Sequence, residues 1–204
     1  MDDIVKQAIA KWPNVPAVFG WLALDRRGNW LIKGERISNP AVIAFISRNY
    51  GHDTRGRWFF QNGPQRVFAA LDYTPLVYRI TWEPAASAAP CIEAHTGEVA
   101  QRVESAWIDD AGVLLLMTEH GMGMIDDRDL DRLLPCFTDE RGNLLPEDAA
   151  ASAIECLQAG GNTAMRFRFH DRAVPVSAVA ARDVPASFGF VQRPMPPDGQ
   201  EKCE

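Results

Sequence analysis

The sequence predicts an α+β fold with mainly antiparallel sheets and an internal duplication. Three observations support this fold. The pattern Asp-x-x-Gly occurs four times in the 204 residues, beginning at Asp25, Asp53, Asp109 and Asp139. The first and third copies lie 84 residues apart, and the second and fourth lie 86 apart, which indicates a collinear repeat. Strand-like segments flank these turns, and an apolar helix-like segment lies within each pair.

The first half is expected to contain two helices, over residues 2–11 and 40–50. Asn39 precedes Pro40, which is typical of a helix start. Asp25 marks a hairpin turn, because Asp favours the first position of a type I turn and Gly the fourth. The strands of this half are expected over residues 18–24, 29–33, 57–61, 65–71 and 75–82.

The boundary between the halves is expected at residues 84–90, which are rich in Ala, Ser and Pro. We therefore predict an N-terminal half over residues 1–84 and a C-terminal half over residues 85–192. The polar, proline-rich residues 193–204 are predicted to be a disordered tail.

The second half is expected to repeat the order of the first. A helix capped by Asp126 should end at Pro135, and an alanine-rich helix should run from Pro146 to residue 157. The strands of this half are expected over residues 91–94, 99–107, 113–118, 122–125, 165–170 and 173–178.

Composition excludes several classes of protein. The longest apolar run covers residues 41–46, far short of the roughly 20 residues that a membrane span needs. The acidic N-terminus lacks a signal-peptide core, so we expect a cytoplasmic protein without a membrane partner. The net charge of −6 argues against a nucleic-acid partner, although residues 25–79 alone carry nine basic and four acidic side chains.

The residue types that carry chemistry are scattered. The four cysteines and four histidines show no spacing typical of a metal site, and no phosphate-binding or dinucleotide fingerprint is present. We therefore expect no metal, no cofactor and no enzymatic activity. His52-Asp53 and His170-Asp171 leave a hydrolase as a minor alternative, but both pairs fall in predicted turns.

One basic and aromatic group of residues is a candidate binding site. Arginine forks suit phosphate or carboxylate groups, and an amide or indole can contact a base or ring. The candidate ligand-binding residues are Arg48, Arg55, Arg57, Trp58, Asn62 and Arg66. We predict that they hold a small anion, such as a nucleotide, at the junction of the halves. The alternatives are that the arginines only solvate a sheet face or pair with the acidic second half across the junction, and that Trp58 belongs to the core.

A family resemblance extends over most of the chain. The segments Trp21-Leu-Ala-Leu-Asp-Arg-Arg-Gly28 and Trp58-Phe-Phe-Gln-Asn-Gly-Pro-Gln-Arg-Val67 resemble an uncharacterised proteobacterial family of unknown function. The order of elements is also similar to the domain-of-unknown-function family twelve eighty-five. That resemblance implies a duplicated core, a pleckstrin-homology-like barrel in the C-terminal half, a small-ligand site where the halves meet, and a signalling role.

The function predicted from the sequence is therefore a non-enzymatic module that binds a small anion or nucleotide and serves signalling. The first alternative is a protein-interaction adaptor without a small ligand, which would bind an acidic partner or accept a peptide strand at a sheet edge. The second is a hydrolase that uses His52 or His170.

Overall fold

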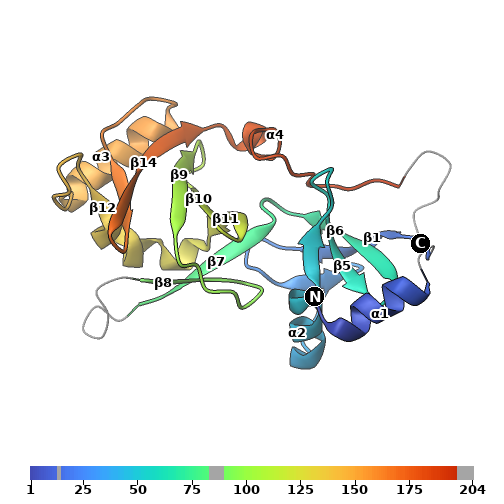
Figure 1. The fold of residues 1–204 in the computed structure, drawn as a ribbon. Helices are drawn as coiled ribbons and strands as arrows, with labels where there is room; N and C mark the ends of the chain where they lie inside the picture. Colours follow the sequence, from blue (N-terminus) through green and yellow to red (C-terminus); the bar gives the residue numbers. More distant parts are fainter. Residues whose placement is uncertain (13–14, 83–89, 197–204) are drawn as a thin grey trace. The chain divides into compact units, whose positions relative to one another are not determined.

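The computed structural model describes residues 1–12, 15–82 and 90–196 and has the predicted α+β fold (Figure 1). The chain forms two compact units. Unit 1 combines Met1–Pro75 with the segment that begins at Phe188, and unit 2 is Leu76–Ser187. The boundary expected at residues 84–90 lies outside the described residues except for Pro90, as does the tail from residue 197. Within the described part of the chain, no helix is long and apolar enough to cross a membrane.

Unit 1 contains a six-stranded sheet with the order β3-β2-β1-β6-β5-β4. Strands β1 and β6 pair in parallel, and the other neighbours pair antiparallel. Its elements are α1 (Asp3–Lys11), β1 (Val18–Leu24), β2 (Trp30–Ile32), β3 (Glu35–Arg36), α2 (Pro40–Arg48), β4 (Tyr50–His52), β5 (Trp58–Asn62) and β6 (Gln65–Leu71).

Unit 2 contains an eight-stranded sheet with the order β12-β13-β14-β9-β10-β11-β7-β8, curled into a half-barrel (Figure 1). Its strands are β7 (Leu76–Thr81), β8 (Cys91–Ala94), β9 (Val103–Asp109), β10 (Leu114–Thr118), β11 (Gly121–Ile125), β12 (Phe137–Thr138), β13 (Arg166–Phe169) and β14 (Arg172–Val179). Its helices are the 3₁₀ helix η1 (Asp127–Cys136), α3 (Glu147–Gln158), η2 (Ala181–Asp183) and α4 (Val184–Ser187).

The strand order shows the internal duplication. Unit 1 runs β3-β2-β1-β6-β5-β4, and unit 2 contains β11-β10-β9-β14-β13-β12 with the same directions. The central pair is parallel in both units, and a helix follows the third strand in both, α2 in one and η1 in the other. Unit 2 adds the hairpin β7–β8 beyond β11 and the helix α3 before β13.

The four Asp-x-x-Gly turns have the same hydrogen bonds. In each turn the Asp Oδ1 accepts the backbone N–H groups two and four residues later, for example from Arg27 and Asn29 to Asp25 at 2.9 and 2.8 Å. The glycine N–H donates to the aspartate carbonyl, and the glycine φ lies between 72° and 84°. Glycine adopts this left-handed conformation without a steric cost, so the repeated motif is one hairpin turn used four times.

Several sequence predictions were incomplete. The helix after Asp126 is a 3₁₀ helix that continues through Pro135 instead of an α-helix that ends there. The sequence also did not predict the short strands β3, β4 and β12, because two or three residues carry too little periodicity.

The segment after Phe188 completes unit 1. The N–H of Val191 donates to the carbonyl of Gly56 at 2.9 Å, and the N–H of Leu71 donates to the carbonyl of Gln192 at 2.7 Å. Phe190 is buried. A segment more than a hundred residues after β6 in the sequence therefore accepts a backbone hydrogen bond from this strand. The hydrophobic pattern of the sequence alone does not reveal this contact.

The close approach of this segment yields a prediction. A Cβ on Gly56 would overlap the carbonyl oxygen of Gly189, and the Gly56 φ is 72°. We expect Gly56→Ala to lower the free energy of unfolding by about 3 kcal/mol, measured by urea denaturation.

Gly142→Ala is the matched control, because Gly142 holds the same turn position with φ 84° and has open space around it. It should cost about 1 kcal/mol from backbone strain alone. Equal losses in the free energy of unfolding of the two variants would show that the close contact with Gly189 does not contribute to stability.

Candidate functional site

An apolar cavity of about 550 Å³ lies in unit 1 between the sheet and α2. This volume is within the range of roughly 300–1,000 Å³ typical of small-molecule sites. None of the lining side chains carries a charge. The lining residues are Val18, Trp21, Leu22, Ile32, Val42, Phe45, Ile46, Phe60, Asn62, Gln65 and Val67.

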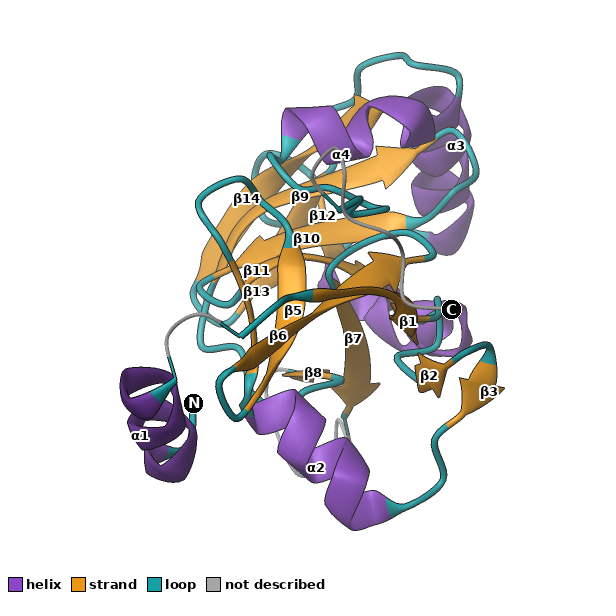
Figure 2. Cartoon of the chain, turned by 90° about the vertical axis from the view of Figure 1, so that its right-hand side faces the viewer, coloured by secondary structure: helices purple, strands orange, loops and turns teal. Residues whose placement is uncertain are grey.

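The lining residues belong to helix α2 and to strands β1, β2, β5 and β6. Figure 2 shows these elements of unit 1. The Asn39 side chain caps α2 by accepting the N–H of Ala41 at 2.9 Å. Phe45 of α2 meets Phe60 of β5 edge to face, with ring centroids 5.4 Å apart. Strand pairing then places Phe60 beside Val67 on this face of the sheet.

A β-bulge in β1 brings Trp21 to the cavity. Val18 pairs with Val67 and Leu22 with Ala69, so β1 uses two more residues than β6 over this stretch. Gly20 lies in the bulge with φ 80°. In a regular strand Trp21 would lie on the face opposite Leu22, whereas here both line the cavity. Bulges of this kind occur next to functional sites, where they redirect a side chain.

Three large apolar side chains remain exposed at the cavity. Trp21, Ile32 and Val42 are 38, 42 and 39 % exposed. The counterpart of Ile32 in unit 2 is Leu116, which follows its turn aspartate at the same spacing and is completely buried. β10, which carries Leu116, lies beside the five-residue β11, while β2 lies beside the two-residue β3. Exposure of an apolar side chain at this position is therefore specific to the first copy of the repeat.

Only Asn62, of the six residues proposed from the sequence, lines this cavity. Trp58 lies on the same face of β5 but is buried, with its ring 4.9 Å from both Tyr50 and His52. Arg48, near the end of α2, pairs with Asp2 at 3.3 Å.

The other arginines lie elsewhere in unit 1. The Arg57 guanidinium stacks over Phe68 and pairs with Asp53 at 2.7 Å. Arg66 stacks over Phe59, on the face opposite the cavity.

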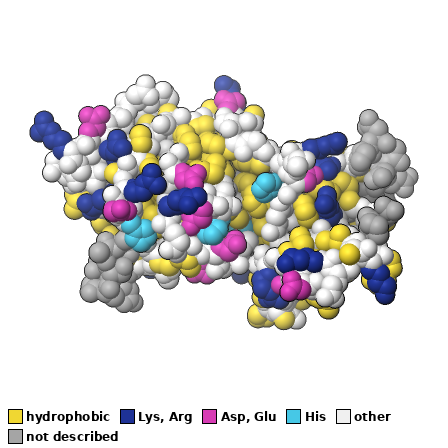
Figure 3. All heavy atoms as spheres, in the orientation of Figure 1, with side chains coloured by type: hydrophobic (Ala, Val, Ile, Leu, Met, Phe, Trp, Pro, Cys, Tyr) yellow, Lys and Arg dark blue, Asp and Glu magenta, His cyan; other side chains and the backbone are white. Residues whose placement is uncertain are grey.

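Burial raises the pKa of Asp53, but hydrogen bonds from Arg57 and from the N–H of Arg55 outweigh this effect, so the pKa of Asp53 is lowered. Figure 3 shows acidic and basic side chains interspersed on the face in view. A role for these arginines in binding an anion stays a prediction.

The sequence did contain a signal for the cavity. Gly20 interrupts an otherwise regular strand pattern, which suggests a bulge. The apolar residues of α2 and β5 were interpreted as core, and only tertiary packing shows that they leave a space between them.

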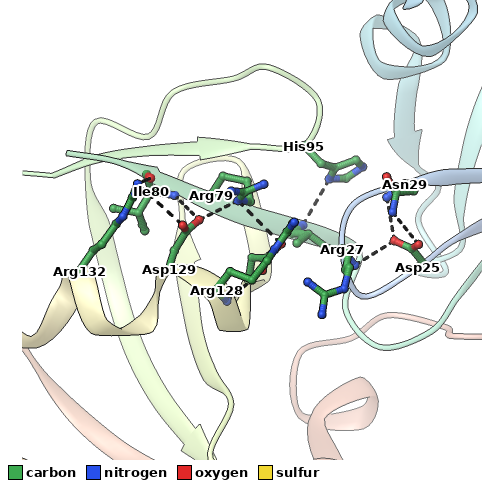
Figure 4. A network of polar contacts seen from close by, with 11 residues as sticks. Asp25, Arg27, Asn29, Arg79, Ile80, His95, Arg128, Asp129 and Arg132 are labelled. Atoms are coloured by element: carbon green, nitrogen blue, oxygen red, sulfur yellow. Dashed lines mark hydrogen bonds and ion pairs between the residues drawn. The ribbon is translucent and has the colours of Figure 1, made fainter. Parts of the chain in front are cut away.

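Unit 2 contains a polar cluster around Asp129, whose residues are among those drawn in Figure 4. Asp129 accepts the Nε–H of Arg79 at 2.7 Å and the N–H of Ile80 at 3.0 Å. Asp126 accepts the Nε–H of Arg128 at 2.8 Å. Both carboxylates are buried, and the hydrogen bond from Arg79 to Asp129 joins β7 to η1. Within residues 1–12, 15–82 and 90–196, no group of three or more His, Cys, Asp or Glu side chains could hold a metal. The cluster anchors η1.

Acid should weaken this anchor. The hydrogen bond from the Arg128 side chain lowers the pKa of Asp126 to about 2, against an opposing effect of burial. A carboxylate with a lowered folded-state pKa contributes stability above its unfolded pKa of about 4, and that stability is lost as the pH falls from about 4 to 2.

We therefore expect Asp126→Asn to lower the free energy of unfolding by about 2 kcal/mol at pH 7 and to lessen its decline between pH 4 and 2. Denaturant unfolding across this pH range measures both effects. Asp131→Asn, an exposed change on the same helix, should keep the wild-type pH profile. An unchanged profile in Asp126→Asn would contradict the assignment.

Comparison with known proteins agrees with the fold. The family model DUF2944, described as "Protein of unknown function (DUF2946)", matches residues 1–195. No curated protein matches the chain. A DUF1285 family protein from Silicibacter pomeroyi DSS-3 is similar in structure, with 16 % identity and a TM-score of 0.52 over 84 % of this chain and 87 % of that chain.

A DUF1285 family protein from Shewanella baltica OS155 has 16 % identity and a TM-score of 0.41, over 54 % of this chain and 87 % of that chain. At such identity, the similarity to the Silicibacter protein shows a shared fold. This is the fold family that the sequence resemblance indicated, so that resemblance is confirmed.

Proposed function

The chain belongs to the DUF2944 family of unknown function, and we propose that it is a non-enzymatic module that binds a small, largely apolar molecule in the cavity of unit 1. The observation that carries this proposal is the open apolar wall of the cavity. Burying one large apolar side chain is worth about 1.5–3 kcal/mol, so a ligand that covers Trp21, Ile32 and Val42 would gain substantial binding energy.

The lining favours binding over catalysis. Its polar side chains are the amides of Asn62 and Gln65, and neither titrates near neutral pH. The Gln65 Nε2 donates to the carbonyl of Pro16 at 3.1 Å. The Asn62 amide is thus the group best placed to orient a ligand.

Ligand binding in the cavity would change the surface that a signalling partner contacts. An empty cavity exposes Trp21, Ile32 and Val42, and a bound ligand would cover them. A partner that contacts this surface would then bind differently to the two states. The anion or nucleotide expected at Arg57 and Arg66 would be a separate ligand, because these side chains lie on the other face of the sheet.

The second candidate function is a protein-interaction adaptor. The same three exposed side chains could accept an apolar side chain of a partner protein, and patches of this kind occur at interaction sites. The two functions differ in a simple way. Only the ligand-binding module should take up a neutral small molecule with one-to-one stoichiometry.

A blocking substitution tests the proposed function. We expect the neutral fluorophore N-phenylnaphthylamine to bind the wild type with increased emission. Val42→Trp should weaken this binding at least about tenfold, since the indole would fill the cavity mouth.

Val99→Trp is the matched control, because Val99 is 41 % exposed in unit 2 and does not line the cavity. It should bind the fluorophore like the wild type. Failure of the wild type to bind, or equal binding by all three proteins, would refute the cavity as a ligand site.

A further inference from the structure

Lys33 places a positive charge beside the cavity. Its Nζ lies 4.5 Å from the centroid of the Trp21 ring, and its N–H donates to the Trp21 carbonyl at 2.8 Å. Lys33 follows Ile32 directly, and both Trp21 and Ile32 line the cavity. The ammonium group therefore lies next to the wall formed by β1 and β2.

The backbone at Lys33 is unusual for a lysine. Its φ is 49°, and Gly34 after it has φ 84°. Tight hairpin turns with this geometry favour Asn, Asp or Gly, and a left-handed residue with a long side chain costs roughly 1–2 kcal/mol. Strain of this kind next to a cavity suggests a functional role for the side chain.

The charge of Lys33 is available to a ligand. Among residues 1–12, 15–82 and 90–196, no carboxylate lies within ion-pair distance of the Lys33 ammonium. The side chain is exposed, and the ring of Trp21 contacts one side of the ammonium group. An anion could approach the other side without displacing a protein carboxylate.

From these observations we propose that the ligand is an anionic amphiphile, with its apolar body in the cavity and its carboxylate or phosphate head group paired with Lys33. This inference rests on the proposed function and adds the ligand class to it. The uncharged wall suits the apolar body. An amphiphile also explains why an apolar cavity lies beside an unpaired cation on a strained turn.

The shape of the cavity agrees with an elongated ligand. Its wall crosses β2, β1, β6 and β5, which are successive neighbours in the sheet. Three strand spacings amount to roughly 14 Å. Lys33 lies at the β2 end of this span, and the Asn62 amide lies at the β5 end. A head group at Lys33 therefore directs the apolar body along the cavity toward Asn62.

The test measures displacement of N-phenylnaphthylamine by four compounds with the same decyl chain, all below their micelle concentrations. Decanoate and decyl phosphate carry anionic heads, decanol is neutral, and decylamine is cationic. We expect the anions to bind about three- to fivefold more tightly than decanol, since a partly exposed ion pair contributes modestly. The cation should bind more weakly than decanol. Salt should reduce these differences.

Lys33→Gln removes the charge and should abolish the preference for anions while leaving the affinity for decanol unchanged. Lys11→Gln is the matched control, because the Lys11 Nζ lies 4.6 Å from the Trp12 ring in the same kind of contact. Lys11 does not line the cavity, so this variant should keep the preference. A higher affinity for decanoate than for decyl phosphate would indicate a fatty acid, and the reverse a phosphorylated lipid.

Two results would overturn the inference. Equal affinities of the wild type for decanoate, decyl phosphate and decanol would show that the head group is not recognised. A preference for anions that survives in Lys33→Gln would place the recognition elsewhere. In both cases, binding of decanol and the neutral fluorophore would leave the proposed function intact, whereas failure of every compound to bind would refute both.

Discussion

The carboxylate of the turn aspartate is the constraint on which the rest of the structure depends. In each hairpin it accepts two backbone N–H groups and fixes a short turn, and the turn fixes the register of the strands. The turn at Asp25 places Leu22 opposite Ile32, and the turn at Asp53 places His52 opposite Trp58. A slip of one residue at either turn would move the cavity wall to the other face of the sheet.

The two copies of the repeat share these turns and their strand order but differ in the strands at one edge. Unit 2 extends its sheet with longer strands and buries Leu116, while unit 1 keeps a short edge strand and leaves Ile32 exposed. The bulge at Gly20 then adds Trp21 to the same face. Both copies thus have a packed core, and the first copy also has an open apolar wall. The shared turns and strand order stabilise both copies, and the short β3 and the bulge at Gly20 create the cavity in the first.

The sequence predicted what depends on local signals. The turns at Asp25 and Asp139, the cap at Asn39 and the strand over residues 65–71 all follow from turn chemistry and alternation. The sequence could not show the return of Val191 to unit 1, because that contact joins distant segments. Among the candidate site residues, Asn62 lines the cavity, but the cavity around it depends on packing between α2 and the sheet, which the sequence could not show.

Methyl NMR of the full chain with decanoate can show whether the cavity of unit 1 receives the ligand. Six lining residues, Val18, Leu22, Ile32, Val42, Ile46 and Val67, carry the reporting methyl groups. We expect decanoate to shift these methyl resonances and to show nuclear Overhauser contacts to them. The methyl groups of Leu114, Leu115 and other core residues of unit 2 should remain unchanged. Contacts confined to methyl groups outside the cavity, with the methyl groups of these six residues unaffected, would contradict binding in the cavity.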